Sequence, residues 1–290
     1  MFKLCLFSFL LFLILASAEE RDLEALVFEP PNQNASFVLM VVCGMHAREA
    51  PFTRGVCNSV IQELSRPVPS NYRVRVVVVP LANPDGLAIL ESNANMSCWR
   101  CNKNEVDLNR NFPLVSANVT GGRMQAVRGD QEYAGPFPLS EWETRSLDRL
   151  MKKHKPTMLI SVHTGTLALF PPYDFTSVKP QGYGKLVQVA KWLRDGVCDD
   201  CFVGRSTTYL GYRAHGTLTD YAFHFLNVPY VYTLEAYDAP EMHMEQSDQL
   251  KPSLCERIFA MAKGTKLQEK WLPLFERVYS ASSDIIEQLQ

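Results

Sequence analysis

The residues Phe37–Glu49, FVLMVVCGMHARE, indicate the fold class. An uninterrupted apolar run, Phe37–Val42, is followed by a histidine and, three positions later, by a glutamate. Such a run is typical of a strand buried on both faces of a parallel sheet. In open α/β sheets ligands bind beyond the carboxyl ends of the strands, so His46 and Glu49 are placed where a site is expected.

Three more apolar runs have the same character: VRVVVV (74–79), MLISV (158–162) and VPYVYTL (228–234). A further strand is expected near 23–28, and helical patterns cover 53–64, 139–153, 184–195 and 270–289. Ser140, with Glu143 three residues later, predicts a capping box at the start of the second helix. This alternation predicts a single α/β domain with a mixed, mostly parallel sheet and helices on both faces.

The composition excludes some classes of partner. The chain has 290 residues, 47% of them hydrophobic and 21% charged, with a formal net charge of −2. This balance is that of a globular domain with one sizeable core. A near-neutral charge and the lack of any nucleic-acid motif predict that neither DNA nor RNA is a partner.

Residues 1–18, MFKLCLFSFLLFLILASA, have the pattern of a signal peptide. One lysine precedes a short apolar run, and small residues precede the expected cleavage after Ala18; an uncleaved anchor is the alternative. The mature domain would then be 19–290, secreted and without a membrane span. Sequons at Asn34, Asn95 and Asn118 agree with a glycosylated, secreted protein.

Seven cysteines remain after the signal segment, and an odd number predicts a free thiol or an intermolecular bond. Cys98-x-x-Cys101 and Cys198-x-x-Cys201 could form a four-cysteine zinc site or a redox module. In a secreted chain disulfides are the favoured interpretation, with a connectivity that the sequence leaves open.

His46 and Glu49 suggest one half of a metal site. A third ligand from another strand would leave a fourth position open, which is the layout of catalytic zinc. His163 directly follows a buried strand, as such a ligand should. His154 lies among lysines and is expected on the surface, whereas His215 is a candidate for lining the site.

The remaining motifs are NPDG (83–86), VDLNRNFP (106–113) and TLEAYD (233–238). Together with HxxE and the later histidine, they resemble in type and order the zinc carboxypeptidases, the M14 metallocarboxypeptidase family. The resemblance covers roughly Leu23–Asp238 and combines features of the digestive and the regulatory branches. It implies hydrolysis of the C-terminal peptide bond of peptides or proteins.

The resemblance implies one zinc ion on His46, Glu49 and His163, with Asp107 orienting the ring of His46. Glu235 would be the general base that takes a proton from water and passes it to the leaving amine. These roles are chemically coherent, because zinc makes water a nucleophile near neutral pH and a nearby carboxylate can accept its proton.

The resemblance also assigns substrate contacts. Arg100 would stabilise the oxyanion, and Asn109 with Arg110 would hold the terminal carboxylate, a task that suits a planar guanidinium. Tyr212 matches a mobile capping tyrosine, and Arg48 matches a further substrate-side arginine.

Two positions bear on which C-terminal residue of the substrate is removed. The residue before the aspartate of GTLTD that decides in the digestive branch would be Thr219 (or Leu218), which is uncharged. Asp174 lies eleven residues after His163, where the regulatory branch has an acid. Charge pairing with Asp174 predicts a preference for C-terminal Lys or Arg. The alternative is that Asp174 is a turn residue after Pro171-Pro172.

The family's usual opening helix and strand are not recognisable before Leu23, so the domain is expected to be shortened at its N-terminus and to lack an edge strand. A natural short form and an incomplete sequence are both compatible with this pattern. Two other functions compete with the peptidase: an M14-like deacylase of N-acyl amino acids and a non-catalytic binding homologue. A redox module is the least favoured.

Overall fold

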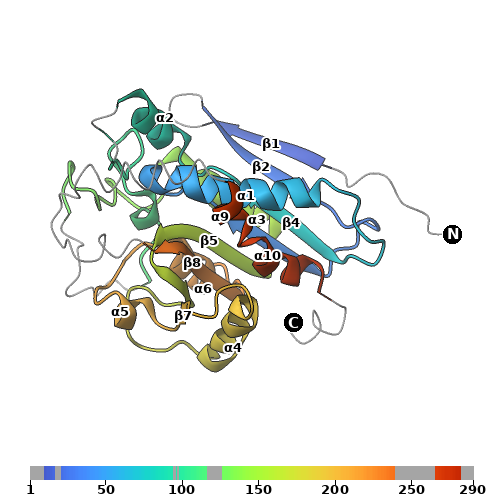
Figure 1. Ribbon diagram of the computed structural model, residues 1–290. Helices are drawn as coiled ribbons and strands as arrows, with labels where there is room; N and C mark the ends of the chain where they lie inside the picture. Colours follow the sequence, from blue (N-terminus) through green and yellow to red (C-terminus); the bar gives the residue numbers. More distant parts are fainter. Residues whose placement is uncertain are drawn as a thin grey trace.

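One mixed sheet organises the part of the chain that the computed structural model describes, namely residues 10–16, 21–93, 96, 98–115, 126–238 and 265–281. Its eight strands run in the order β1-β2-β4-β3-β5-β8-β6-β7 (Figure 1). The strands are β1 Leu10–Ala16, β2 Asp22–Phe28, β3 Phe37–Val42, β4 Val74–Val79, β5 Met158–Gly165, β6 Leu167–Phe170, β7 Phe202–Val203 and β8 Tyr230–Asp238.

Helices connect and cover these strands. The α-helices are α1 Ala50–Leu64, α2 Pro84–Ser92, α3 Trp142–His154, α4 Tyr183–Arg194, α5 Ser206–Tyr209, α6 Leu218–His224, α9 Thr265–Glu269 and α10 Leu272–Tyr279. Two short 3-10 helices, η1 Ala47–Glu49 and η3 Leu108–Arg110, carry candidate site residues. The end of the last expected helix, 282–290, lies outside the described residues.

The centre of the sheet is parallel, as the apolar runs predict. Strands β4, β3, β5 and β8 pair in parallel. Strand β2 is antiparallel to both β1 and β4, and β6 is antiparallel to β8 and parallel to β7. The bounds of β3 and β4 agree with the predicted ranges 37–42 and 74–79. The predicted mixed α/β fold is therefore confirmed.

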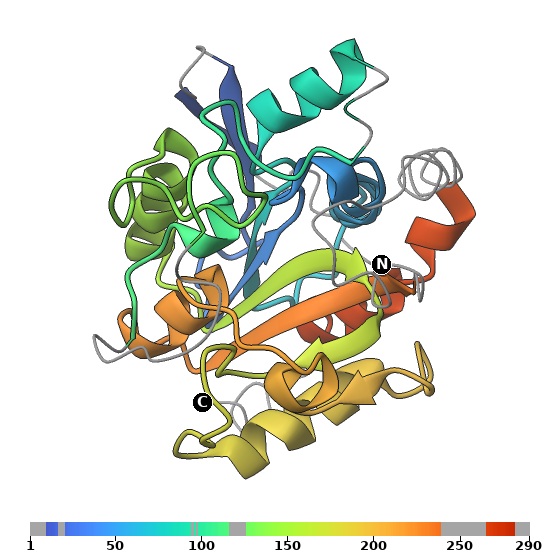
Figure 2. The same ribbon diagram turned by 90° about the vertical axis from the view of Figure 1, so that its left-hand side faces the viewer.

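Alternate residues of the central strands enter two separate cores. Leu39 and Val41 pack with α1, α4 and α10, whereas Met40 and Val42 pack with α3 and α6. Figures 1 and 2 show these helices covering opposite faces of the sheet. Burial on both faces leaves the strand ends as the places where polar residues can gather without disturbing a core.

The predicted capping box is wrong. Helix α3 begins at Trp142, and its N-cap is Glu141 rather than Ser140. The Ser140 hydroxyl lies 2.9 Å from Nδ2 of Asn111 and donates to Glu141 at 2.6 Å. These contacts to a neighbouring loop use the hydroxyl that the capping box requires.

The edge of the sheet also differs from the expectation. We expected no strand beside β2, but Leu10–Ala16 forms β1 and pairs with β2 along its whole length. An apolar segment of this length can satisfy the backbone groups that an edge strand leaves open. The segment lies within the predicted signal peptide, whose removal stays a prediction.

The cysteines form disulfides rather than a zinc or redox site. Cys43 is bonded to Cys57, Cys198 is bonded to Cys201, and Cys98 is also disulfide-bonded. Cys101 is buried and free, in agreement with the odd count. Within the described residues, no helix is long and apolar enough to cross a membrane.

Candidate active site

Three predicted ligands meet at the carboxyl ends of β3 and β5. His46 precedes η1, Glu49 ends it, and His163 lies near the end of β5. Nδ1 of His46 is 2.7 Å from one Glu49 oxygen, and Nδ1 of His163 is 3.1 Å from the other. One candidate ligand atom from each residue lies within 4.8 Å of the other two, and all three residues are buried.

The second nitrogen of each imidazole also has a partner. Nε2 of His46 lies 3.2 Å from Oδ1 of Asp107, and Nε2 of His163 lies 2.9 Å from the Ser161 hydroxyl. Asp107 is held in turn by Nε of Arg100 at 2.8 Å. Such outer contacts fix the orientation of histidine rings in metal sites, so the arrangement fits a metal ion.

The charges of the site suit a cation. Burial acts to raise the pKa of Glu49, but His46 and His163 together hold this pKa well below its usual value. Burial opposes ionisation of Asp107 as well, and Arg100 and His46 hold its pKa well below the usual value. Both carboxylates are therefore anionic at neutral pH, which is the form that binds zinc.

Glu235 lies next to these groups because β5 and β8 are parallel neighbours. His163 and Glu235 face each other in the register of the two strands. A Cβ at Gly165 would lie 3.4 Å from Oε2 of Glu235, so this carboxylate lies beside the end of β5. Oε2 is buried and has no hydrogen-bond partner among the described residues. Burial raises the pKa of Glu235 to about 7, with His163 opposing the shift and Glu49 adding to it.

Two arginines border the triad, of which Arg100 is buried and Arg48 is half-buried. Nη1 of Arg100 lies 3.6 Å from Oε1 of Glu49. Burial acts to lower the pKa of Arg100, but Asp107 and Glu49 raise it. Arg48 donates to the side chain of Gln131 and to the carbonyl of Cys98. Burial and the charge of Arg100 lower the pKa of Arg48 to about 10.

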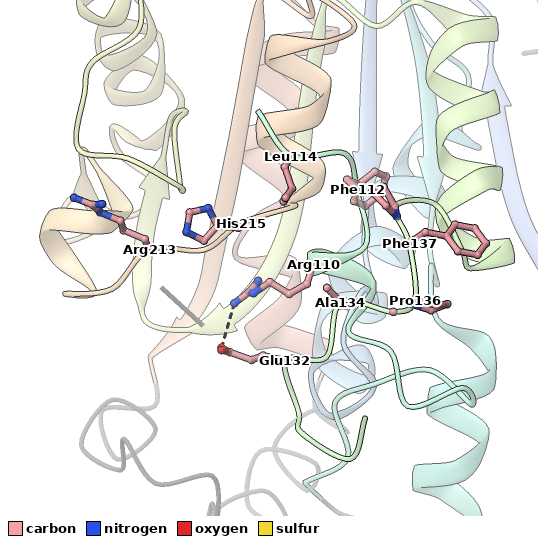
Figure 3. Close-up of a pocket in the computed structure, with 11 residues that line it drawn as sticks. Arg110, Phe112, Leu114, Glu132, Ala134, Pro136, Phe137, Arg213 and His215 are labelled. Carbon is pink, nitrogen blue, oxygen red and sulfur yellow. Dashed lines mark hydrogen bonds and ion pairs between the residues drawn. The ribbon is translucent and has the colours of Figure 1, made fainter. Parts of the chain in front are cut away.

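The residues of the expected carboxylate clamp lie on and beside η3. Oδ1 of Asn109 accepts a hydrogen bond from the backbone of Leu218 at 2.9 Å. The guanidinium of Arg110 lies 3.2 Å from Glu132, and both line a pocket of about 190 Å³ (Figure 3). Tyr212 is 46% exposed. Partial desolvation raises the pKa of its hydroxyl, whereas the charges of Arg110 and Arg100 act to lower this pKa.

The two specificity candidates are in contact. Asp174 is buried and accepts hydrogen bonds from Thr219 at 2.8 Å and from Ser206 at 2.6 Å. Its backbone nitrogen donates to the carboxylate of Asp220 at 3.0 Å. Burial and the charge of Asp174 raise the pKa of Asp220 well above its usual value.

Of the other histidines, His154 differs from the prediction and His215 agrees with it. His154 is buried, with 8% exposed, because the end of α3 packs against the domain. His215 lines the pocket next to Arg110. The motif residue Asp85 pairs with Arg21 at 2.9 Å.

Sequence reasoning missed several contact residues. Ser161 could have been found, since it lies two positions before His163 and therefore on the same side of the strand. Gln131 and Glu132 carry no such signal, because they lie in an irregular segment. Only the folded chain brings them to Arg48 and Arg110.

The comparisons with known proteins agree with this geometry. The family model for zinc carboxypeptidase, the M14 peptidases, matches residues 10–259. The chain belongs to this family. Human carboxypeptidase O is 25% identical over 244 residues, which cover 76% of this chain and 63% of the relative. The chain thus spans less than two thirds of that relative's length.

Solved carboxypeptidase structures share the fold. Carboxypeptidase A from Helicoverpa armigera superposes with a TM-score of 0.74 at 20% identity, over 96% of this chain and 70% of the other. Bovine thrombin-activatable fibrinolysis inhibitor, solved in complex with a tick carboxypeptidase inhibitor, gives 0.71 at 20% identity, over 94% and 91%. At 20% identity, these two similarities show that this chain shares the fold of the two solved carboxypeptidase structures.

Proposed function

We propose that this chain is a secreted, zinc-dependent metallocarboxypeptidase that hydrolyses the C-terminal peptide bond of peptides or proteins. The observation that carries the proposal is the cluster of His46, Glu49 and His163, with the buried carboxylate of Glu235 beside it. The disulfides Cys43–Cys57 and Cys198–Cys201, together with the disulfide-bonded Cys98, support an oxidising compartment.

His46, Glu49 and His163 would hold the zinc ion. A zinc ion at such a site supplies Lewis acidity and makes water nucleophilic near neutral pH. Asp107 contacts the ring of His46, and Ser161 contacts the ring of His163. The Nδ1 atoms of both rings then face the carboxylate of Glu49. The His-Glu-His set offers the nitrogen and oxygen donors that zinc takes in catalytic sites.

Glu235 would act as the general base. Its Oε2 is buried and has no hydrogen-bond partner among the described residues, so it is available to accept a proton from water and to donate it later to the leaving amine. Arg100, which stays protonated, would stabilise the negative charge that develops on the carbonyl oxygen.

Arg110 and Asn109 would bind the terminal carboxylate of the substrate, and Tyr212 would cover it from the exposed loop. Arg48 would contact the substrate on the other side of Arg100. A guanidinium can bind the two oxygens of a carboxylate at once, which selects a free chain end over an internal peptide bond.

Asp174, together with Thr219, would select a C-terminal Lys or Arg. Asp174 and Asp220 are neighbouring buried carboxylates, and neither forms an ion pair with Lys or Arg in the described part of the chain. A cationic substrate side chain would supply the counter-charge that the buried Asp174 carboxylate lacks among these residues, whereas an apolar one would not.

The decisive experiment combines metal analysis of the purified protein with trimming of C-terminal peptides, with and without a chelator. We expect one zinc per chain, loss of trimming in the chelator and recovery on adding zinc. Glu235→Gln should keep the zinc and lose the trimming. A folded preparation with neither zinc nor trimming would refute the proposal.

A further inference from the structure

The guanidinium of Arg110 already has carboxylate neighbours within the chain. Nη2 lies 3.2 Å from Oε1 of Glu132, and Nη1 lies 4.0 Å from Oδ2 of Asp107. Nη1 also donates to the backbone carbonyl of Asn109 at 3.0 Å. Figure 3 shows the Arg110 side chain directed toward Glu132 along one wall of the pocket.

Glu132 is the acid that compensates Arg110 most directly. Asp107 forms its shorter contacts with Arg100 and His46, so Glu132 supplies the close charge at Arg110. The side chains of Arg110 and Glu132 are only 10% and 15% exposed, and water screens such a pair weakly. Burial acts to lower the pKa of Arg110, whereas Asp107 and Glu132 raise it.

We propose that Glu132 is a specificity-determining residue that weakens the preference of Arg110 for a free C-terminal carboxylate over a C-terminal carboxamide. The inference rests on the proposed role of Arg110 in the peptidase. If Glu132 has this role, the substrates include peptides with an amidated C-terminus as well as peptides with a free C-terminal carboxylate.

The physical reason is competition for one guanidinium. A substrate carboxylate can share Arg110 with Glu132, which brings two anions together. It can otherwise displace Glu132, which separates the ion pair between Glu132 and Arg110. A carboxamide carries no charge and meets no such repulsion. Both side chains line the pocket of about 190 Å³, so a substrate group that enters it meets both charges.

The test replaces Glu132 by the isosteric glutamine and compares matched peptides that end in an acid or an amide. We expect Glu132→Gln to raise the acid-to-amide ratio of kcat/KM about tenfold, mainly through a lower KM for the acid. Glu132→Asp retains the charge and should give a smaller change. Glu29→Gln, which removes a half-buried glutamate from its pair with Arg75, is the control and should leave the ratio unchanged.

A binding measurement separates this inference from the proposed function. In a Glu235→Gln background, calorimetry would compare N-benzoyl-arginine with its amide, and the corresponding phenylalanine pair, with and without Glu132→Gln. Tighter binding of the acid alone supports the role of Glu132, even if the chain hydrolyses no peptide. If Glu132→Gln leaves the acid-to-amide ratio unchanged in both kinetics and binding, the role of Glu132 is overturned. This holds even if the unsubstituted chain trims peptides and the proposed peptidase function is correct.

Discussion

Thr219 and Asp174 are joined by a hydrogen bond of 2.8 Å from the threonine hydroxyl to the aspartate carboxylate. Ser206 donates to the other carboxylate oxygen at 2.6 Å. The two positions that bear on side-chain preference therefore form one buried unit.

This unit gives the first prediction. Asp174→Asn should lower kcat/KM for C-terminal Lys and Arg peptides by about thirtyfold or more, because a buried charge partner is lost. Peptides ending in Phe or Leu should change far less. Thr219→Val removes one hydrogen bond to Asp174 and no charge, so it should lower kcat/KM for the basic peptides less than Asp174→Asn does. Equal losses for basic and apolar peptides would contradict the prediction.

The second prediction concerns the ring of His46. Asp107→Asn should weaken zinc binding about 10- to 100-fold, because the contact that orients the imidazole loses its charge. Competition with a fluorescent chelator would measure the affinity, and circular dichroism would check the fold. Asp195→Asn, at an exposed surface position, serves as the control. Identical zinc affinities for the two variants would argue against the role of Asp107.

The third prediction is a pH dependence set by Glu235. A general base acts only as the carboxylate, so kcat/KM should rise with pH through the pKa of Glu235 and then level off. Burial raises this pKa to about 7 in the protein chain, and a bound cation would draw it lower. The measurement is kcat/KM between about pH 4 and pH 8. A flat profile across this range would sink the assignment.

The fourth prediction concerns stability. Replacing Cys43 and Cys57 by alanine should lower the free energy of unfolding by about 3 kcal/mol, because their disulfide closes a loop of 14 residues. The same change at Cys198 and Cys201, three residues apart, should cost about 1.6 kcal/mol. Urea unfolding would measure both. A larger loss at the second pair would show that strain or packing outweighs loop entropy.

The elements that were predicted correctly carry their signal in the local sequence. Strand β3 is a continuous apolar run, β4 is apolar except for Arg75, and the bounds of both agree with the prediction. Strand β6 is short and β7 shorter still, so neither has enough residues for a recognisable pattern. Strand β1 was missed because the same apolar residues fit the pattern of a signal peptide.

The sequence by itself determined the parallel centre of the sheet, the family and the polar residues that follow the strands. These features depend on patterns within short stretches, such as the run before His46 and the motif around Asp107. The tertiary structure alone decided the pairings of Arg110 with Glu132 and of Asp174 with Thr219. Their partners lie 22 and 45 positions apart in the chain, and no local pattern records which loops meet when the sheet and its helices pack.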